Sequence, residues 1–554
     1  MLQLEPVEPR DDLDRSGRVL DGRVEVFALC AAVLLGFAVR LRYVLASGFP
    51  LNDGGLFYVT IQALQRSHYA LPAFVSYNGL RIPFAYPPLG FYAAALLTDF
   101  LHLGLFTVLR VVPLVMSTLS IGAFALLARA VLPSRQAAVA ATFAFAALPM
   151  GFVWYIMGGG LTRSFGFLFA ILALQQTHRA LQRPTAARMV LAALPAALAV
   201  LSHPEESLFL ATGAVVLFLT FVRSRQGMWM AFVLAAGIAV LTAPWWGTVL
   251  AAHGVAPFLA VARAVDSNPL DGVVALFLFG TYEPLFPIIG ALALLGLVAC
   301  CARKQYLLPL WLLAIPLVDP RNTTMHETVV FALLAGIGLA EVLVPLVGRL
   351  QAEGKIRRFR FHLPGLTIWV AEAPLAYAFL MAVVVPQATL GALTAADRDA
   401  MRWAAQQTPP ASRFLIVAGL SPNPGGQRTW GADRVAEWFP VLAQRTSVIT
   451  PQGREWIGTF AATVTNYGDA QLCAERDTSC LGDWLKKSGE DFNYLYIPKS
   501  TATDGGAASD GQNCCRLLRY SLRADSHYLV VFDGPGATIY ERQPEGNATA
   551  SDPA

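Results

Sequence analysis

A set of ionisable residues stands at the ends of apolar segments, where a charge is costly unless it is paired or hydrated. They lie in five short motifs, PLNDGG, GGGLTRS, SHPEE, TYEP and DPRNTTMHE. The residues are Asp53, Arg163, His203, Glu205, Glu206, Glu283, Arg321, His326 and Glu327. Because charge at such boundaries usually serves a function, we take these residues as candidates for one site.

Asp53 is the leading catalytic candidate, because it lies in a glycine-flanked loop directly before an expected interfacial helix. A carboxylate in that place can act as a general base for a hydroxyl group. The competing interpretation is that Asp53 caps the helix that begins near Gly54. The two roles are compatible with each other.

Two further groups admit a functional and a structural interpretation. Arg321 and His326 can receive a phosphate group, since arginine forms charge-assisted hydrogen bonds with oxyanions; ordinary anchoring at the membrane interface is the alternative. In the SHPEE motif, Pro204 can begin a helix, and Glu205 and Glu206 then interact favourably with the positive end of its dipole. This structural role would explain the motif without a catalytic role.

The elements that must position these residues are membrane spans. The chain has 554 residues, of which 55% are hydrophobic and 14% charged, with a mean hydropathy of +0.51. Repeated apolar runs of the length needed to cross a bilayer predict about eleven spans. They cover residues 25–46, 107–130, 137–156, 162–181, 187–203, 205–223, 228–246, 284–302, 305–319, 328–348 and 364–388. The net charge of +4 and the lack of a basic stripe argue against a nucleic-acid partner.

The orientation follows from the basic connections. With residues 1–24 in the cytoplasm, every cytoplasmic connection carries basic residues, as the positive-inside rule requires. These are Arg129, Arg135, His178, Arg179, Arg183, Arg188, Arg223, Arg225, Arg303, Lys304, Arg349, Lys355, Arg357, Arg358 and Arg360. The first loop, residues 47–106, and the chain after the membrane domain 25–390 then lie outside the cytoplasm. We therefore expect an integral protein of the plasma (inner) membrane that contacts membrane lipid.

The outer segments have secondary structure of their own. In the first loop, residues 56–65 and 88–104 predict helices that lie along or partly within the membrane. Residues 391–545 alternate between helical and strand patterns, which predicts a small extracytoplasmic α/β domain. Its expected helices are 395–407 and 432–443, and its expected strands are 413–420, 493–497, 528–532 and 538–541. Residues 546–554 predict a disordered tail.

Four of the seven cysteines fall in this outer domain: Cys473, Cys480, Cys514 and Cys515. Outside the cytoplasm they can form two disulfides, and the sequence leaves all three pairings open. A zinc site is the alternative, but the spacing lacks a CxxC pair.

The motifs and their order resemble those of the GT-C superfamily of membrane glycosyltransferases, above all its protein O-mannosyltransferase and lipid A aminoarabinose transferase branches. PLNDGG resembles the first-loop acidic motif, YPPLGFY the Pro-Pro-Leu helix, residues 109–135 the next span with its basic turn, and DPRNTTMHETVVFALLAG a late basic segment. The resemblance covers residues 25–345. It implies that Asp53 is the catalytic carboxylate and that Arg321, His326 and Arg163 lie near a donor phosphate.

The chain also departs from that family. The usual Asp-Glu pair is Asp53-Gly54 here, and the second outer loop has no acid between Trp154 and Ser164, so a divalent metal is doubtful and no other cofactor is expected. The Trp-Trp-Asp motif of oligosaccharyltransferases is absent, although WFPVLAQRTSVITPQG resembles the sequence that follows it.

The resemblance implies an inverting transfer of a sugar from a polyprenyl-phosphate donor to a glycan, lipid or protein acceptor. The position and the cysteine content of the outer domain suggest the hypothesis that it binds the acceptor. A transporter or lipid flippase is the main alternative, but the chain shows no internal repeat of the kind common in transporters. A non-catalytic scaffold with an outer recognition domain is a further alternative.

Overall fold

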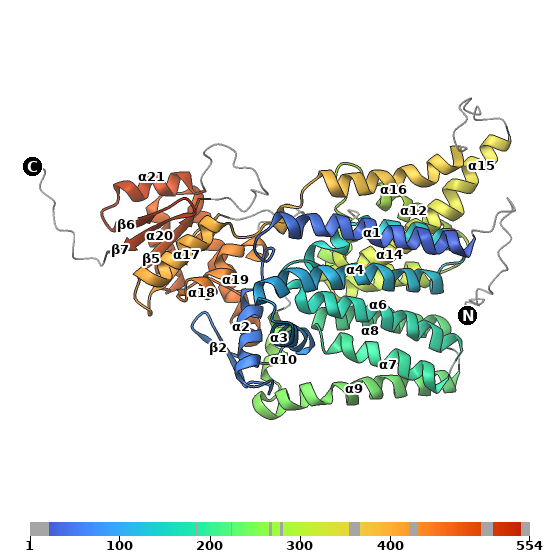
Figure 1. Cartoon of the computed structure of the whole chain (residues 1–554), viewed down its shortest axis with the longest axis horizontal. Coiled ribbons are helices and arrows are strands. Elements are labelled where there is room, and N and C mark those ends of the chain that lie inside the picture. Colours follow the sequence, from blue (N-terminus) through green and yellow to red (C-terminus); the bar gives the residue numbers. More distant parts are fainter. Residues whose placement is uncertain are drawn as a thin grey trace, which may run out of the picture.

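The structure of the chain, a computed structural model, describes residues 21–183, 185–222, 224–264, 269–277, 281–353, 366–419, 430–499 and 514–543. It has two parts: a bundle of long helices and an α/β domain at one end of the bundle (Figure 1). Residues 1–20 of the expected N-terminal segment, most of the basic connection after residue 353 and the expected disordered tail lie outside the described residues.

Helices occur at each of the eleven ranges where the sequence predicts a span. They are α1 (Gly22–Ala46), α4 (Leu105–Val131), α5 (Arg135–Ala147), α6 (Gly160–Gln182), α7 (Ala186–Val200), α8 (Pro204–Phe221), α9 (Arg225–His253), α12 (Ile288–Ala302), α13 (Leu307–Val318), α14 (Thr323–Ile337) and α16 (Leu366–Val384). A π-helical turn, η4 (Gly338–Leu343), continues α14 into α15 (Val344–Ala352), and the short helices α10 (Ala256–Ala264) and α11 (Pro269–Phe277) follow α9.

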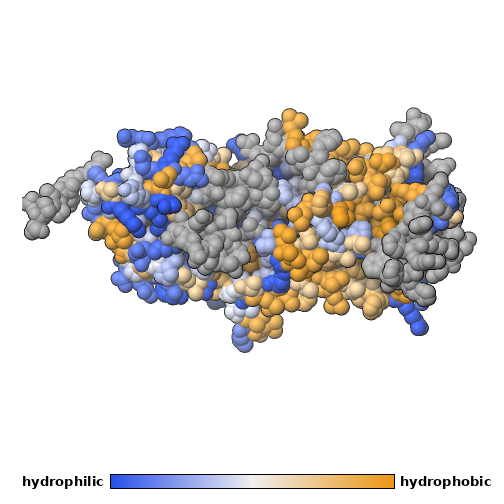
Figure 2. Space-filling view, turned by 90° about the horizontal axis from the view of Figure 1, so that it is seen from above, coloured by the Kyte–Doolittle hydropathy of each residue, from blue (hydrophilic) through white to orange (hydrophobic). Residues whose placement is uncertain are grey.

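The surface of the bundle is strongly hydrophobic, whereas that of the α/β domain is mostly hydrophilic (Figure 2). Among the described residues, five helices are long and apolar enough to cross a bilayer, or up to seven if each of two bent helix pairs is one span. The bundle is therefore a membrane domain. The number of eleven spans stays a prediction, because several of the predicted helices are short.

The two ends of the bundle differ. Glu25 near the start of α1 forms ion pairs with Arg129 (2.6 Å) and Arg135 (3.4 Å), so the first basic turn lies at the same end as the start of α1. The α/β domain and helix α2 (Gly55–Arg66) lie at the opposite end (Figure 1). This arrangement agrees with the predicted topology, in which the first basic connection and the outer domain lie on opposite sides of the membrane.

The first loop is folded. It contains α2, a hairpin of β1 (Phe74–Tyr77) and β2 (Leu80–Pro83), and α3 (Leu89–Leu101). Both helices were expected, whereas the hairpin was not. Its turn is Asn78-Gly79, both with positive φ, a pair that favours tight hairpin turns.

The α/β domain holds a five-stranded sheet in the order β4-β3-β5-β7-β6. Strand β3 (Arg413–Ile416) is parallel to β4 (Thr446–Ser447) and β5 (Tyr494–Pro498), and β7 (Ala537–Arg542) is antiparallel to β5 and to β6 (Tyr528–Asp533). The helices are α17 (Ala395–Gln407), α18 (Arg434–Leu442), α19 (Phe460–Gln471), α20 (Thr478–Ser488) and α21 (Arg516–Ala524), with short 3₁₀ turns between them, among them η7 (Arg454–Trp456). The expected elements 395–407, 432–443, 493–497, 528–532 and 538–541 are present within two residues, whereas the strand expected at 413–420 ends at Ile416.

Side chains that alternate along β3 face two different cores. Leu415 and Val417 pack with α19, α20 and α21 in a core that belongs to the domain alone. Phe414 and Ile416 belong to a second core, which also contains Phe49 of the first loop and further residues of α2, α3 and α18. The α/β domain and the first loop therefore share one hydrophobic core.

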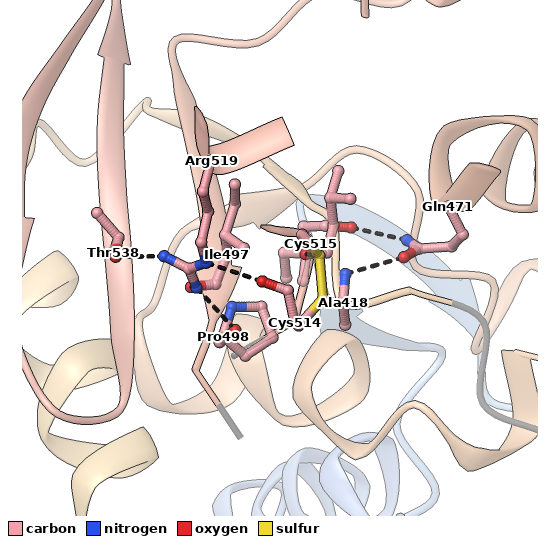
Figure 3. Close-up of a disulfide and its surroundings, with 10 residues drawn as sticks. Ala418, Gln471, Ile497, Pro498, Cys514, Cys515, Arg519 and Thr538 are labelled. Carbon is pink, nitrogen blue, oxygen red and sulfur yellow. Dashed lines mark hydrogen bonds between the residues drawn. A yellow bond between two sulfur atoms is a disulfide. The ribbon is translucent and has the colours of Figure 1, made fainter. Parts of the chain in front are cut away.

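The four outer cysteines form two disulfides, Cys473–Cys480 and Cys514–Cys515. The second joins neighbouring residues at the start of α21, close to the ends of β3 and β5 (Figure 3). Arg519 fixes this corner by donating to the carbonyl oxygens of Cys514, Ile497 and Pro498. One of the three pairings left open by the sequence is thereby selected.

Candidate functional site

The Asp53 loop lies against the start of α6. The amide of Gly159 donates to Asp53 Oδ1 at 2.8 Å, and Gly159 is the N-cap of α6, where the helix dipole favours a negative charge. A Cβ atom built on Gly158 would lie 2.1 Å from the carbonyl oxygen of Asp53, and one on Gly159 would lie 2.4 Å from Oδ2. The GGG sequence thus permits the close approach of Asp53 to this helix.

The N-cap residue of α2 is Gly54 and not Asp53, so the side chain of Asp53 does not cap this helix. Burial raises the pKa of Asp53, and the Gly159 amide and the positive charge of Arg163 oppose that rise. Asp53 keeps partial contact with solvent. It is therefore a half-buried carboxylate held in place by a backbone amide, as suits a general base.

Two arginines, Arg163 and Arg321, form a cationic centre. Arg163 lies on the same helix as Gly159, one turn further along. Arg163 Nη2 contacts Glu205 Oε2 at 2.8 Å, and Arg321 Nη1 lies 3.7 Å from Glu205 Oε1. The Arg163 side chain is 17% exposed, whereas that of Arg321 is 41% exposed. Arg163 is thus committed to Glu205, whereas Arg321 makes no hydrogen bond within the part of the chain that the structure describes, and its donors can face a ligand.

His326 is placed differently from Arg321. Its ring lies 3.3 Å from Glu206 and 3.4 Å from Asp319, and its side chain is 1% exposed. The expectation that His326 and Arg321 bind one phosphate together does not fit this geometry, because the imidazole is enclosed by carboxylates. His326 instead lies between the carboxylates of Glu206 and Asp319.

The SHPEE corner combines both of its interpretations. Pro204 occupies the first turn of α8, with Glu205 and Glu206 after it, as expected for a helix start. The same two acids also contact Arg163 and His326 from other helices. His203 is buried, and its ring stacks edge-on against that of Tyr86, with centroids 5.9 Å apart.

The last two candidates stand apart from this centre. Glu283 accepts hydrogen bonds from the amides of Ile289 (2.8 Å) and Gly290 (3.0 Å), so it supports the start of α12. Glu327 is fully buried, and within the described residues its oxygens have no hydrogen-bond partner. Their place in the site stays a prediction.

Two carboxylates of the α/β domain reach the site, and neither was a candidate. Glu437 of α18 accepts hydrogen bonds from the backbone beside Asp53. Burial raises the pKa of Glu455 in η7 to about 7, and the positive charge of Arg321 opposes the rise. The following residue, Trp456, packs against Tyr86 with ring centroids 5.5 Å apart. The sequence carried one signal for these two residues. WFPVLAQRTSVITPQG, which lies between Glu437 and Glu455, resembles a segment of oligosaccharyltransferases.

Among the described residues, no group of three or more His, Cys, Asp or Glu side chains could hold a metal ion. Beside Asp53 the second outer loop offers glycine backbone, and Glu437, a further carboxylate, is engaged with backbone amides. These residues do not fit a divalent metal, and we assign no step to one.

Neither a scan against models of protein families nor a search of curated proteins finds a match for this sequence. Solved structures do match. The oligosaccharyltransferase AglB from Archaeoglobus fulgidus, in complex with an inhibitory peptide and a dolichol-phosphate, has a TM-score of 0.54 at 16% identity over 87% of this chain and 70% of its own. ArnT from Cupriavidus metallidurans, bound to undecaprenyl phosphate, has a TM-score of 0.52 at 16% identity over 93% and 97%.

The arabinofuranosyltransferase AftD from Mycobacteria matches with a TM-score of 0.52 at 16% identity, over 95% of this chain but 40% of its own length. All three are GT-C glycosyltransferases. The chain has the GT-C fold. The resemblance seen in the motifs of the sequence is thereby confirmed for the fold. At 16% identity, a shared fold does not show which reaction a chain catalyses, so the reaction has to be inferred from the site.

Proposed function

We propose that this chain is a membrane glycosyltransferase that moves a sugar from a polyprenyl-phosphate carrier to an acceptor on the extracytoplasmic side of the membrane. The observation that supports it best is the hydrogen bond of 2.8 Å between Asp53 and Gly159. It ties a carboxylate to the helix that carries Arg163, and Arg163 in turn shares Glu205 with the exposed Arg321. A base and a cation for the leaving phosphate are thus parts of one connected site.

The reaction is a single displacement. The acceptor oxygen forms a bond to the anomeric carbon while the bond from that carbon to the phosphate oxygen breaks, and the electron pair leaves with the polyprenyl phosphate. Asp53 takes the proton of the acceptor hydroxyl. Arg321 stabilises the negative charge of the departing phosphate. One displacement inverts the configuration of the anomeric carbon.

The mostly apolar surface of the bundle suits a donor that stays in the bilayer through its polyprenyl chain. The likeness of the chain to glycosyltransferase structures favours a transferase over the transporter alternative. The AglB and ArnT structures hold dolichol-phosphate and undecaprenyl phosphate, and we propose the same class of carrier here. The acceptor is a glycan, lipid or protein.

The test is transfer of label from radiolabelled polyprenyl-phosphate sugars in membranes that contain the full chain. Wild type is compared with Asp53→Asn, a nearly isosteric change that removes the base. We expect a loss of at least about 100-fold in rate for the variant, the scale of general base catalysis. Equal rates would refute the role of Asp53. No transfer or release of label by the wild type, with several sugars and acceptors, would refute the transferase.

A further inference from the structure

The helix that follows Asp53 receives its cap from the α/β domain. The amide of Gly54 donates to Glu437 Oε2 at 3.0 Å, and the amide of Leu56 donates to Glu437 Oε1 at 3.3 Å. The first amides of a helix have no hydrogen-bond partner within the helix. A carboxylate at this position accepts their hydrogen bonds and interacts favourably with the positive end of the helix dipole. Glu437 thus does from a distant part of the chain what a local cap residue usually does.

The backbone on the other side of Asp53 is held by the next residue of α18. Trp438 Nε1 donates to the carbonyl oxygen of Asn52 at 3.0 Å. Consecutive residues of α18 therefore bind the residues immediately before and after Asp53, while Gly159 binds its side chain. Asp53 is held between the α/β domain and the start of α6.

The close fit explains the two glycines after Asp53. Gly54 has a φ of 126°, which side chains disfavour, and an added Cβ would lie 3.1 Å from the Trp438 ring. A Cβ on Gly55 would lie 2.6 Å from the carbonyl oxygen of Glu437. The departure from the usual Asp-Glu pair thus leaves room for α18.

The charges agree with this arrangement. Glu437 is 3% exposed, and burial raises its pKa well above its ordinary value, with a further rise from the negative charge of Asp53. The amides of Gly54 and Leu56, which donate to Glu437, oppose this rise.

We propose that Glu437 is a positioning residue for Asp53, so that the α/β domain completes the transfer site. This inference rests on the proposed function, in which Asp53 takes a proton from the acceptor. The chemistry of Glu437 is indirect: it fixes the backbone of the base and need not touch the substrate.

The first test is kinetic and uses the full chain. Glu437→Ala should lower kcat by about 100-fold, the scale of a displacement of about 1 Å in a reacting group, while the KM for the donor stays within about threefold. Glu437→Gln keeps one acceptor oxygen and should fall between wild type and alanine. The control is Glu490→Gln, which removes a surface ion pair with Arg413 in the same domain and should leave kcat unchanged.

A residue that merely holds the domain together would not change the titration of the base. In Glu437→Ala, water enters beside Asp53 and lowers its raised pKa, so the acidic limb of the kcat profile should move to lower pH. If Glu437→Ala and Glu437→Gln match wild type in kcat while Asp53→Asn is inactive, the positioning role is refuted and the proposed function stands.

The second test needs no substrate. Amide hydrogen exchange in residues 52–58 should speed up by about 10-fold or more in Glu437→Ala, because two protected amides lose their acceptor, and should stay unchanged in Glu490→Gln. Trp438→Phe, which removes the bond to Asn52, gives a second variant if the alanine variant fails to fold. Unchanged exchange in both substituted forms would overturn the inference even if wild type transfers no sugar.

Discussion

Substituting Gly159 by alanine should displace Asp53 while leaving every candidate side chain in the protein. The backbone at Gly159 has φ −71° and ψ −10°, which alanine adopts freely, so the effect is steric alone. The new Cβ would lie 2.4 Å from Asp53 Oδ2, and real Cβ contacts essentially never fall below 3.0 Å. The carboxylate must therefore retreat by about 0.6 Å or more, the difference between these two distances.

Such a shift lengthens the present 2.8 Å hydrogen bond from Gly159 beyond the usual range and moves the base away from the acceptor oxygen. We expect kcat in the label-transfer assay to fall by about 10- to 100-fold. Gly122→Ala is the matched control, because a Cβ at Gly122 meets no atom within 4 Å, and it should transfer at the wild-type rate. Full activity of Gly159→Ala beside an inactive Asp53→Asn would refute the claim that this contact sets the position of the base.

Three further predictions follow from the site and the outer domain. Arg321→Gln should raise the donor KM by about 10- to 100-fold, because a charge-assisted hydrogen bond to phosphate is lost; an unchanged KM in steady-state assays would count against phosphate binding there. The pKa of Glu455 lies at about 7 in the folded chain against 4.5 for an ordinary glutamate, so the folded state holds a proton that the unfolded chain releases, and wild type loses stability as pH rises through this window. Glu455→Gln cannot ionise and should therefore gain Tm relative to wild type between pH 5 and pH 8 in detergent, by a free energy below about 3 kcal/mol because Glu455 is partly exposed; a constant difference in Tm would refute the raised pKa. Replacing Cys473 and Cys480, which are seven residues apart, by serine should cost about 2 kcal/mol of stability, and a reductant should then no longer lower Tm through that bond.

Much of the fold could be predicted from local patterns. Apolar runs of membrane length placed a helix at each of the eleven expected spans, since burying such runs in lipid requires internal hydrogen bonding. The same reasoning found α2 and α3 in the first loop. The hairpin at residues 74–83 was missed because its strands have four residues each, although its Asn-Gly turn carried the signal.

The candidate site could be predicted in part. Asp53, Arg163 and Glu205 were expected to meet because the topology placed their loops at one side of the membrane, and the structure joins them through Gly159 and α6. Burial was harder to foresee. Whether a basic residue of the DPRNTTMHE motif faces solvent or a carboxylate depends on packing against other helices. His326 was therefore expected to face a phosphate, although it lies between the carboxylates of Glu206 and Asp319.

The contact between the α/β domain and the Asp53 loop had no signal in the sequence near Asp53. Glu437 and Gly54 are 383 residues apart in sequence, and a glutamate in an amphipathic helix normally faces solvent. Only the folded chain shows that α18 lies against the Asp53 loop and that Phe49 and Trp438 belong to one hydrophobic core.

This shared core changes how the role of the outer domain can be tested. The expectation that this domain binds the acceptor suggests deleting residues 395–554 and measuring transfer. That deletion would also expose Phe49 and Phe91 to water and leave the first amides of α2 without Glu437. Loss of activity would then follow from damage to the Asp53 loop, whether or not the domain binds an acceptor. Substitutions of surface residues far from α18 separate the two roles, because they leave the support of Asp53 intact.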